Sequence, residues 1–147
     1  MPTAPHPGPI DLRQARPGSF CWLDLAARDA MRARAFYGAA FGWTFTDEFA
    51  NGGSFMRLHA GGRAAGSLYQ LRAALVEAGV PSHWTPYIRV DDADAALRRT
   101  TRCGGRTVVA PFVVDRTARI ALVEDAVGAL IGLWQPLPLD EQGAGVG

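Results

Sequence analysis

The sequence predicts an α+β fold of two βαβββ modules in a pseudo-two-fold arrangement that forms a cup-shaped cleft. The main observation is an internal repeat: Trp22–Gly42 and Thr85–Gly105 read alike, about 60 residues apart. Each copy runs from an alternating strand through an acidic helix start and an Ala/Arg-rich helix to a glycine. The two first strands also alternate in the same phase, which a chance likeness would not preserve. A βα unit used twice in a small domain is typical of a paired scaffold with a cleft between its halves.

The first module predicts one helix and four strands. Residues 20–26 alternate as a strand does. Asp29 is a plausible N-cap of a helix that ends at Gly42. Further strands are expected at 43–46, 54–59 and 64–69, with turns at Asn51–Gly53 and Gly61–Gly62 between them. The apolar stripe that we expect the helix to bury consists of Met31, Ala35, Phe36 and Ala39.

The second module repeats this order after a linker at 71–83 that carries a short helix over Leu71–Ala78. A strand is predicted at 84–90, and a helix follows to about Cys103, stopped by Gly104–Gly105. Three more strands are predicted, at 107–109, 117–124 and 129–134.

We therefore expect three parts along the chain. Residues 1–17 form a loosely ordered arm because they are rich in proline and lack a hydrophobic period. Residues 18–135 form a single domain, with module one at about 18–70 and module two at about 84–135. Residues 136–147 form a loose C-terminal tail.

Composition excludes several classes of protein. With 147 residues and a net charge of +1, the chain has no electrostatic basis for binding nucleic acid or an anionic membrane. No apolar run is long enough to span a membrane, and no signal peptide is recognised. Cys21 and Cys103 form no disulfide framework or metal motif. These features favour a cytoplasmic protein with reduced thiols.

Strand alternation assigns side chains to two faces. Leu23 and Leu25 are expected to pack toward the first helix, as Pro86 and Ile88 pack toward the second. The opposite, concave face then carries Trp22, Asp24, Thr85, Tyr87 and Arg89.

At this point the chain resembles the vicinal oxygen chelate superfamily, which includes glyoxalase I, extradiol dioxygenases and the bleomycin-resistance proteins. The residues that carry the resemblance are Asp29–Trp43, Val90–Asp92, Gly104–Gly105, Val123–Gly128 and Gly132–Gln135. The resemblance covers about 18–135 and implies two βαβββ modules that close around a cup. It also implies a homodimer, since many two-module members dimerise.

The family usually holds a divalent metal with His, Gln or Glu side chains. The resemblance places those positions at Trp22, Gly66, Thr85 and Gly132, and none of these residues is a His or a carboxylate. A shift of one residue along the first strands does not supply them. We therefore expect no catalytic metal, and we predict no other cofactor.

Without a metal, the cup is expected to be an aromatic pocket with few polar groups, suited to a flat, partly apolar molecule. Glycine at two of the ligand positions is expected to make room for it. The alternative is that these aromatic residues simply fill the core. The predicted ligand-binding residues are Trp22, Phe20, Phe45, Thr85, Leu68, Leu130 and Trp134.

Four residues are candidates for catalysis. Asp24 is the first, because a desolvated carboxylate has a raised pKa and acts as a base or hydrogen-bond acceptor. Tyr87 and Arg89 would stabilise developing negative charge, and His59 is the fourth candidate. The alternatives are a salt bridge from Asp24 to Arg89 or Arg57, a rim ion pair for Arg89, and a surface position for His59.

Three functions follow. The first is a metal-independent protein that binds a small aromatic or polyketide-like metabolite, including an antibiotic-sequestering version. The second is a metal-free isomerase, cyclase or lyase that uses Asp24 with Tyr87 and Arg89. The third is a metal-dependent lyase or dioxygenase, for which ligands are lacking.

Overall fold

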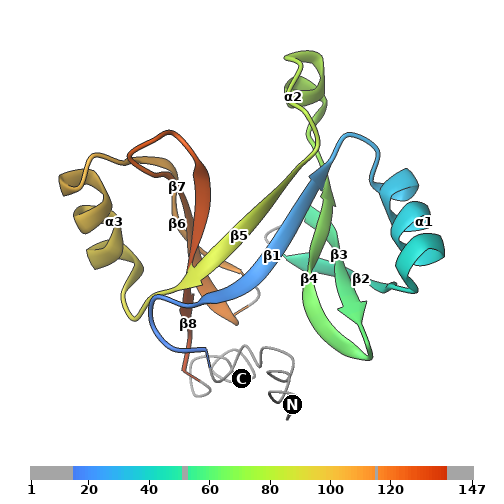
Figure 1. The fold of residues 1–147 in the computed structure, drawn as a ribbon, viewed down its shortest axis with the longest axis horizontal. Coiled ribbons are helices and arrows are strands. Elements are labelled where there is room, and N and C mark those ends of the chain that lie inside the picture. The colour runs from blue at the N-terminus through green and yellow to red at the C-terminus, as the bar shows by residue number, and fades with distance from the viewer. Residues whose placement is uncertain (1–14, 51–52, 115, 139–147) are drawn as a thin grey trace, which may run out of the picture.

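The computed structural model describes residues 15–50, 53–114 and 116–138 and has one curled eight-stranded sheet, with helices outside it (Figure 1). The strand order is β2-β3-β4-β1-β5-β8-β7-β6. The two halves of this order are equivalent, because β1 corresponds to β5, β4 to β8, β3 to β7 and β2 to β6. The sequence prediction of two βαβββ modules is confirmed.

The first half contains β1 (Phe20–Ala27), α1 (Ala30–Phe41), β2 (Thr44–Ala50), β3 (Gly53–Ala60) and β4 (Arg63–Gln70). The linker carries α2 (Ala73–Glu77). The second half contains β5 (His83–Arg89), α3 (Ala93–Arg102), β6 (Arg106–Val114), β7 (Ala118–Glu124) and β8 (Leu130–Pro136). Residues 51 and 52 of the predicted Asn51–Gly53 turn lie outside the described residues.

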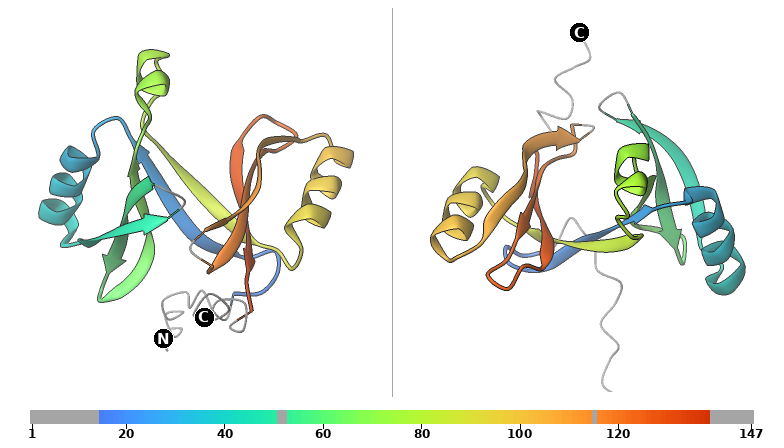
Figure 2. Two further views of the ribbon diagram at one scale, coloured as in Figure 1. Left: turned by 180° about the vertical axis from the view of Figure 1, so that it is seen from behind. Right: turned by 90° about the horizontal axis from the view of Figure 1, so that it is seen from above.

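The halves meet where β1 and β5 pair antiparallel at the middle of the sheet. Within each half the first strand pairs parallel with the last, β1 with β4 and β5 with β8. Figure 2 shows α1 and α3 on the outer flanks of the curled sheet, so its inner face is free of helices. In the described part of the chain, no helix is long and apolar enough to cross a membrane.

The same contacts hold each helix to its strands. The side chains of Asp29 and Asp92 accept hydrogen bonds from the backbone N–H groups of the first turns of α1 and α3. Gln70, at the end of β4, accepts from the N–H of Ala30 at 2.9 Å. Gln135, on β8, accepts from Ala93 at the same distance. The scaffold is therefore repeated in detail.

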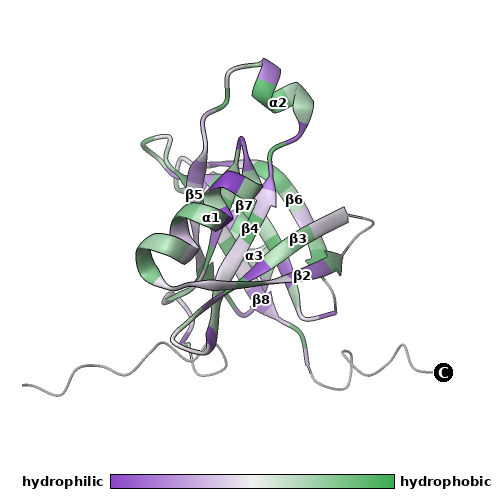
Figure 3. Cartoon of the chain, turned by 90° about the vertical axis from the view of Figure 1, so that its right-hand side faces the viewer, coloured by the Kyte–Doolittle hydropathy of each residue, from purple (hydrophilic) through white to green (hydrophobic). Residues whose placement is uncertain are grey.

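Two cores lie between the sheet and the helices. Under α1, Leu25, Met56 and Leu68 pack with Ala30, and Ala33 and Tyr37 add to them. Under α3, Val90, Val123 and Leu133 pack with small alanines. The expected stripe of α1 was wrong: Met31 and Phe36 are 65% and 58% exposed, and Ala35 and Ala39 are also exposed. Figure 3 shows α1 coloured largely as hydrophobic.

Strand β6 is longer than predicted. The sequence indicated residues 107–109, because Pro111 normally interrupts a strand. The strand instead runs over Arg106–Val114. It is an edge strand with a register shift between Val109 and Phe112, and an edge tolerates a residue that lacks a backbone donor.

Candidate functional site

A buried carboxylate lies at the centre of the inner face. Asp24 on β1 is 9% exposed, and its Oδ1 accepts a hydrogen bond from Trp22 Nε1 at 2.9 Å. The same indole N–H lies 3.0 Å from the Oγ of Ser67, which faces Asp24 from β4. The hydroxyl groups of Tyr87 and Ser67 also lie close enough to Asp24 to lower the pKa of its carboxyl. One indole and two hydroxyls thus surround one carboxylate.

The surroundings of Asp24 change its acidity. Burial raises the pKa of this carboxyl, and hydrogen bonds from Tyr87, Ser67 and Trp22 offset part of that rise, so that the pKa is about 6 instead of 3.8. Burial and the nearby Asp24 charge raise the pKa of Tyr87 and of Tyr69. At neutral pH the cluster therefore holds one carboxylate, a hydrogen-bond acceptor, among neutral hydroxyl donors.

Asp24 belongs to a polar row that crosses the first half of the sheet. Strand register places Thr85 opposite Asp24, Asp24 opposite Ser67, and Ser67 opposite Arg57. Thr46 on β2 is opposite Arg57. Directly paired residues project from the same face of a sheet. The row therefore presents hydroxyl, carboxylate and guanidinium groups to the inner face.

The second half of the inner face is apolar. Trp22 and Tyr87 pack with Ile120 and Ala118 in one buried cluster, and Trp134 packs against it. The Trp134 ring lies 5.3 Å from that of Trp22 and 6.1 Å from that of Tyr87, between ring centroids. This cluster meets the polar row at Trp22 and Tyr87.

The expectation that glycines make room for a ligand was wrong. A Cβ on Gly132 would lie 2.2 Å from the Tyr87 ring, so this space is already filled. A Cβ on Gly66 would lie 2.2 Å from the Leu23 carbonyl oxygen. Glycine at these positions allows a close approach of Tyr87 to β8 and of β4 to β1.

The structure brings together some of the predicted site residues. Trp22, Asp24, Thr85, Tyr87 and Trp134 lie in or beside the cluster.

Arg89 and His59 lie apart from Asp24. The Arg89 guanidinium donates to the Ala15 carbonyl oxygen, and its charge acts on Cys21, whose pKa burial raises to about 11. The ring of His59, on β3, lies 3.1 Å from the hydroxyl of Thr46, on β2. No salt bridge to Asp24 is present among the described residues, because Arg57 contacts Glu48 instead.

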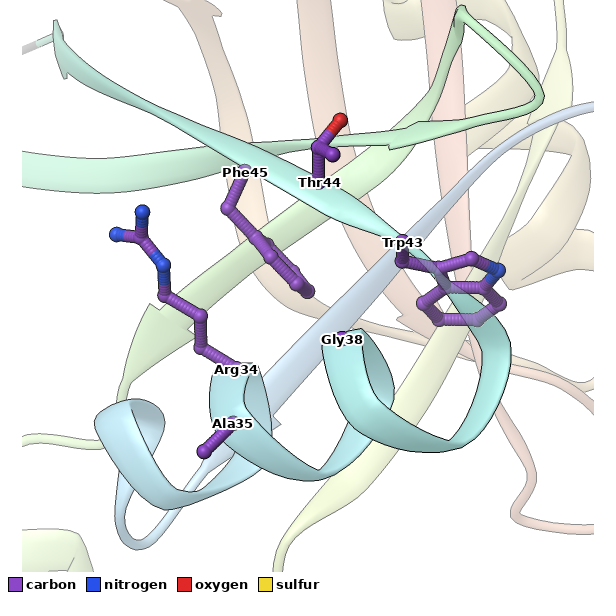
Figure 4. Close-up of a pocket in the computed structure, with 6 residues that line it drawn as sticks. All are labelled: Arg34, Ala35, Gly38, Trp43, Thr44 and Phe45. Carbon is purple, nitrogen blue, oxygen red and sulfur yellow. The ribbon is translucent and has the colours of Figure 1, made fainter.

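Leu68 and Phe45 do not line the inner face, contrary to the prediction. Leu68 is 1% exposed in the core under α1, and Phe45 packs against the same core. Figure 4 shows Phe45 directed toward α1 and Thr44 directed away from it. The faces of β2 and β4 were therefore assigned the wrong way round, whereas those of β1 and β5 were assigned correctly.

A separate pocket lies on the outer side of the first half, between α1 and β2 (Figure 4). Its volume is about 460 Å³, and it contains Phe45 but neither Asp24 nor Trp22. The lining residues are Arg34, Ala35, Gly38, Trp43, Thr44 and Phe45.

Phe20 and Leu130 are at the margins. Phe20 is 57% exposed and lies opposite Ile88, because one extra residue on β1 shifts the register before Trp22. Such a bulge reverses the facing of the residues before it, so Phe20 does not share the face of Trp22 as predicted. Leu130 is half-buried at the start of β8, on the same side as Gly132 and Trp134.

The residues at the family's metal positions do not fit a metal ion. Gly66 and Gly132 have no side chain, and the Trp22 indole offers a donor that is already bonded to Asp24. Thr85 is 2% exposed and contributes at most one hydroxyl. In residues 15–50, 53–114 and 116–138, no three His, Cys, Asp or Glu side chains form a group that could hold a metal.

Ser67 and Tyr69 were missed by the sequence reasoning. Both lie on β4 opposite residues of β1, Ser67 opposite Asp24 and Tyr69 opposite Ala26. A signal existed: if Leu68 packs under the helix, alternation places its two neighbours on the inner face.

Comparison with known families identifies the fold. The family described as the Glyoxalase/Bleomycin resistance protein/Dioxygenase superfamily matches residues 19–133.

Two curated relatives are similar over most of this chain. "Putative glyoxylase CFP32" of Mycobacterium bovis is 32% identical over 122 residues, covering 82% of this chain and 46% of the relative. "Anthracycline biosynthesis protein DnrV" of Streptomyces peucetius is 31% identical over 130 residues, covering 81% and 47%. The chain thus spans about half the length of the curated relatives it matches.

Solved structures share the architecture. Methylmalonyl-CoA epimerase from Mycobacterium tuberculosis is 24% identical, with a TM-score of 0.61, covering 83% of this chain and 89% of that chain. A hypothetical protein from Bacillus halodurans gives the same TM-score at 13% identity, covering 84% and 97%. At these identities the likeness concerns the fold alone.

Proposed function

The chain belongs to the Glyoxalase/Bleomycin resistance protein/Dioxygenase superfamily, and from this premise we propose that it binds a small aromatic or polyketide-like metabolite without a catalytic metal. The observation that carries the proposal is the contact on the inner face between the aromatic cluster and the buried carboxylate of Asp24. Trp134 is half-buried beside Trp22, and Asp24 lies next to both aromatic rings at this contact. A planar ligand would stack on the half-buried Trp134 ring and hydrogen-bond to the polar row.

Each half of the inner face makes a different contribution to binding. Burial of Trp134 and Leu122 by the ligand would supply affinity at roughly 25 cal/mol per Å² of apolar surface. Asp24 and Ser67 would fix the orientation of a hydroxyl or carbonyl group. Antibiotic sequestration is one form of this activity.

The similarity to a protein of anthracycline biosynthesis supports the ligand class, since anthracyclines are polycyclic aromatic compounds. The lack of suitable side chains at the four metal positions supports metal independence.

A second function, metal-free proton transfer, is favoured by the acidity of Asp24. A general base works best with a pKa near the operating pH, and the pKa of Asp24 is raised to about 6. Asp24 would take a proton from an acidic C–H or O–H of the substrate and return it at another position. The product would be an isomer or, after loss of a leaving group, an elimination product.

Thermal shift measurements test the binding function. Wild-type protein is screened against anthraquinone-type compounds and divalent metals, each with and without EDTA. We expect an aromatic compound to raise Tm by a few degrees and EDTA to leave Tm unchanged. A stabilisation by metal that EDTA removes would contradict metal independence.

The Asp24→Asn variant separates binding from catalysis. In a binding protein it should lose at most part of its affinity, whereas in an enzyme it should lose turnover of any compound found in the screen. Asp91→Asn is the matched control, because Asp91 is exposed and follows β5 outside the cluster. Full turnover by Asp24→Asn would exclude an acid–base role.

We also propose that the chain forms homodimers. Large apolar side chains remain exposed on its surface, among them Phe36, Phe41 and Phe112, and exposed apolar groups often mark a protein–protein contact. Light scattering after size exclusion should give twice the 15.7 kDa mass of the chain; a monomer mass at all concentrations would contradict the proposal.

A further inference from the structure

We propose that Arg57 selects ligands that carry an anionic oxygen, such as a carboxylate or an ionised enol. This inference rests on the proposed binding function and specifies the ligand class of the same inner face. It makes Arg57 a specificity-determining residue that the sequence analysis considered only as a salt-bridge partner of Asp24.

Arg57 lies in the polar row of the inner face. Its neighbours on β3, Met56 and Leu58, are buried, with Met56 in the core under α1. Alternation therefore directs Arg57 to the inner face. It is opposite Ser67, which in turn is opposite Asp24.

The guanidinium of Arg57 is incompletely bonded. Its Nε is buried and has no hydrogen-bond partner in the described residues. Arg89 and Arg119 also have an unpartnered Nε. However, other nitrogens of these two side chains donate to the Ala15 carbonyl and to Asp94. The Nε itself is covered, but the Arg57 side chain as a whole is 31% exposed, so a ligand oxygen would reach the guanidinium through its exposed part.

The nearest counter-charge leaves Arg57 available. Glu48, on the same face of β2, has its Oε1 3.4 Å from the Arg57 Nε, without forming a hydrogen bond. Both side chains are 31% exposed. An ion pair that reaches water is worth at most about 1 kcal/mol, so an anionic ligand can compete with Glu48 for the guanidinium.

Asp24 and Arg57 are the two charged side chains of the row, and they lie on different strands. They are two strands apart, which corresponds to roughly 10 Å, and the Arg57 charge is not among the causes that shift the Asp24 pKa. Ser67 lies between them. A ligand lying across β4 would thus direct an anionic oxygen to Arg57 and a hydroxyl hydrogen to Asp24. Thr46 and His59 would border the anionic group.

A pair of probes of matched shape tests this inference. Anthraquinone-2-carboxylate is anionic, and anthraquinone-2-carboxamide is neutral; binding of each is measured by quenching of tryptophan fluorescence. For the wild-type protein we expect tighter binding of the carboxylate. The Arg57→Gln variant should bind the carboxylate about tenfold more weakly, because a charge-assisted hydrogen bond is lost. Its affinity for the carboxamide should change less than about twofold.

Two further variants serve as controls. Glu48→Gln removes the competing carboxylate and should tighten carboxylate binding by about two- to fivefold. Arg98→Gln removes the same charge from the exposed surface of α3, away from the inner face, and should leave both affinities unchanged. Circular dichroism checks that each variant is folded.

The outcomes separate the two proposals. If wild type binds both probes and Arg57→Gln weakens neither, or weakens both equally, the role of Arg57 is wrong and the aromatic binding site stands. If Arg98→Gln weakens carboxylate binding as much as Arg57→Gln, the effect is general electrostatics and the role is again wrong. If wild type binds neither probe, the binding function itself is contradicted, and the inference with it.

Discussion

The two halves of the sheet are alike on their outer faces and different on their inner faces. On the outer face, Asp29 and Gln70 hold α1 through the same bonds that Asp92 and Gln135 make to α3. On the inner face, equivalent rows are Asp24, Ser67, Arg57 and Thr46 in the first half and Tyr87, Gly132, Leu122 and Val109 in the second.

This contrast separates the contacts that form the fold from the side chains available for binding. The repeated outer contacts build the same scaffold twice, and so they explain the fold but not the function. The inner rows differ in every position, from polar to aromatic or apolar. We infer that the second half supplies packing energy and the first half supplies recognition. Each prediction below tests one side of this division.

The largest expected effect concerns packing in the second half. Ile120→Ala should lower the free energy of unfolding by about 3 kcal/mol, because Ile120 is 8% exposed in the inner cluster and its loss leaves a cavity. Thr46→Ala, in the polar row of the first half, should cost about 1 kcal/mol or less, since Thr46 is exposed and its hydroxyl lies 3.1 Å from the His59 ring. Urea denaturation measures both; equal losses would refute the division.

Much of this architecture was predictable from the sequence. The repeat, the caps Asp29 and Asp92, and the glycine after α1 define the two modules through local rules. Alternation in β1 and β5 also placed Trp22 and Tyr87 on one face, because both strands have clear alternating patterns. Helix caps, helix-ending glycines and strand alternation were enough to predict the order of helices and strands.

The failures arose where facing depended on tertiary packing. Alternation divides a strand such as β4 into two faces but does not say which face meets a helix, so Leu68 was assigned to the wrong side. Helix α1 has alanines on every side, so the hydrophobic pattern does not show which side faces the sheet. The small Ala30 and Ala33 approach the sheet, while Phe36 remains exposed. The bulge before Trp22 reversed Phe20 without a local signal.

The second prediction concerns the loss of stability with rising pH that Asp24 of the first half should cause. The Asp24 pKa is about 6 in the folded protein, against 3.8 as the ordinary value. The folded state therefore binds this proton more tightly, and the resulting stability is fully present below about pH 3.8 and lost as pH rises through about 6. The stability of wild type relative to Asp24→Asn should fall by about 2 kcal/mol between pH 4 and pH 8.

The half-buried Glu124 of the second half provides a comparison of opposite sign. A hydrogen bond from Arg106 lowers the pKa of Glu124, so its contribution is lost as pH falls. The stability of wild type relative to Glu124→Gln should decline toward acid pH. Urea titrations at several pH values measure both trends. A stability difference for Asp24→Asn that is independent of pH would contradict the desolvation of Asp24.

The smallest expected effect is on Ser67, the hydroxyl that the second half replaces with Gly132. Ser67→Ala should cost about 1 kcal/mol of stability, since its Oγ lies 3.0 Å from the Trp22 indole nitrogen. It should also raise the Asp24 pKa above about 6, because the Ser67 hydrogen bond lowers it. A pH titration of Trp22 fluorescence reports the midpoint, because the indole N–H is bonded to Asp24.

Ser82→Ala is the control: Ser82 accepts from the Arg28 N–H at 3.0 Å, at an exposed site. Its loss should leave the midpoint unchanged. A midpoint that stays the same in Ser67→Ala would mean that Trp22 and Tyr87 alone hold the carboxylate.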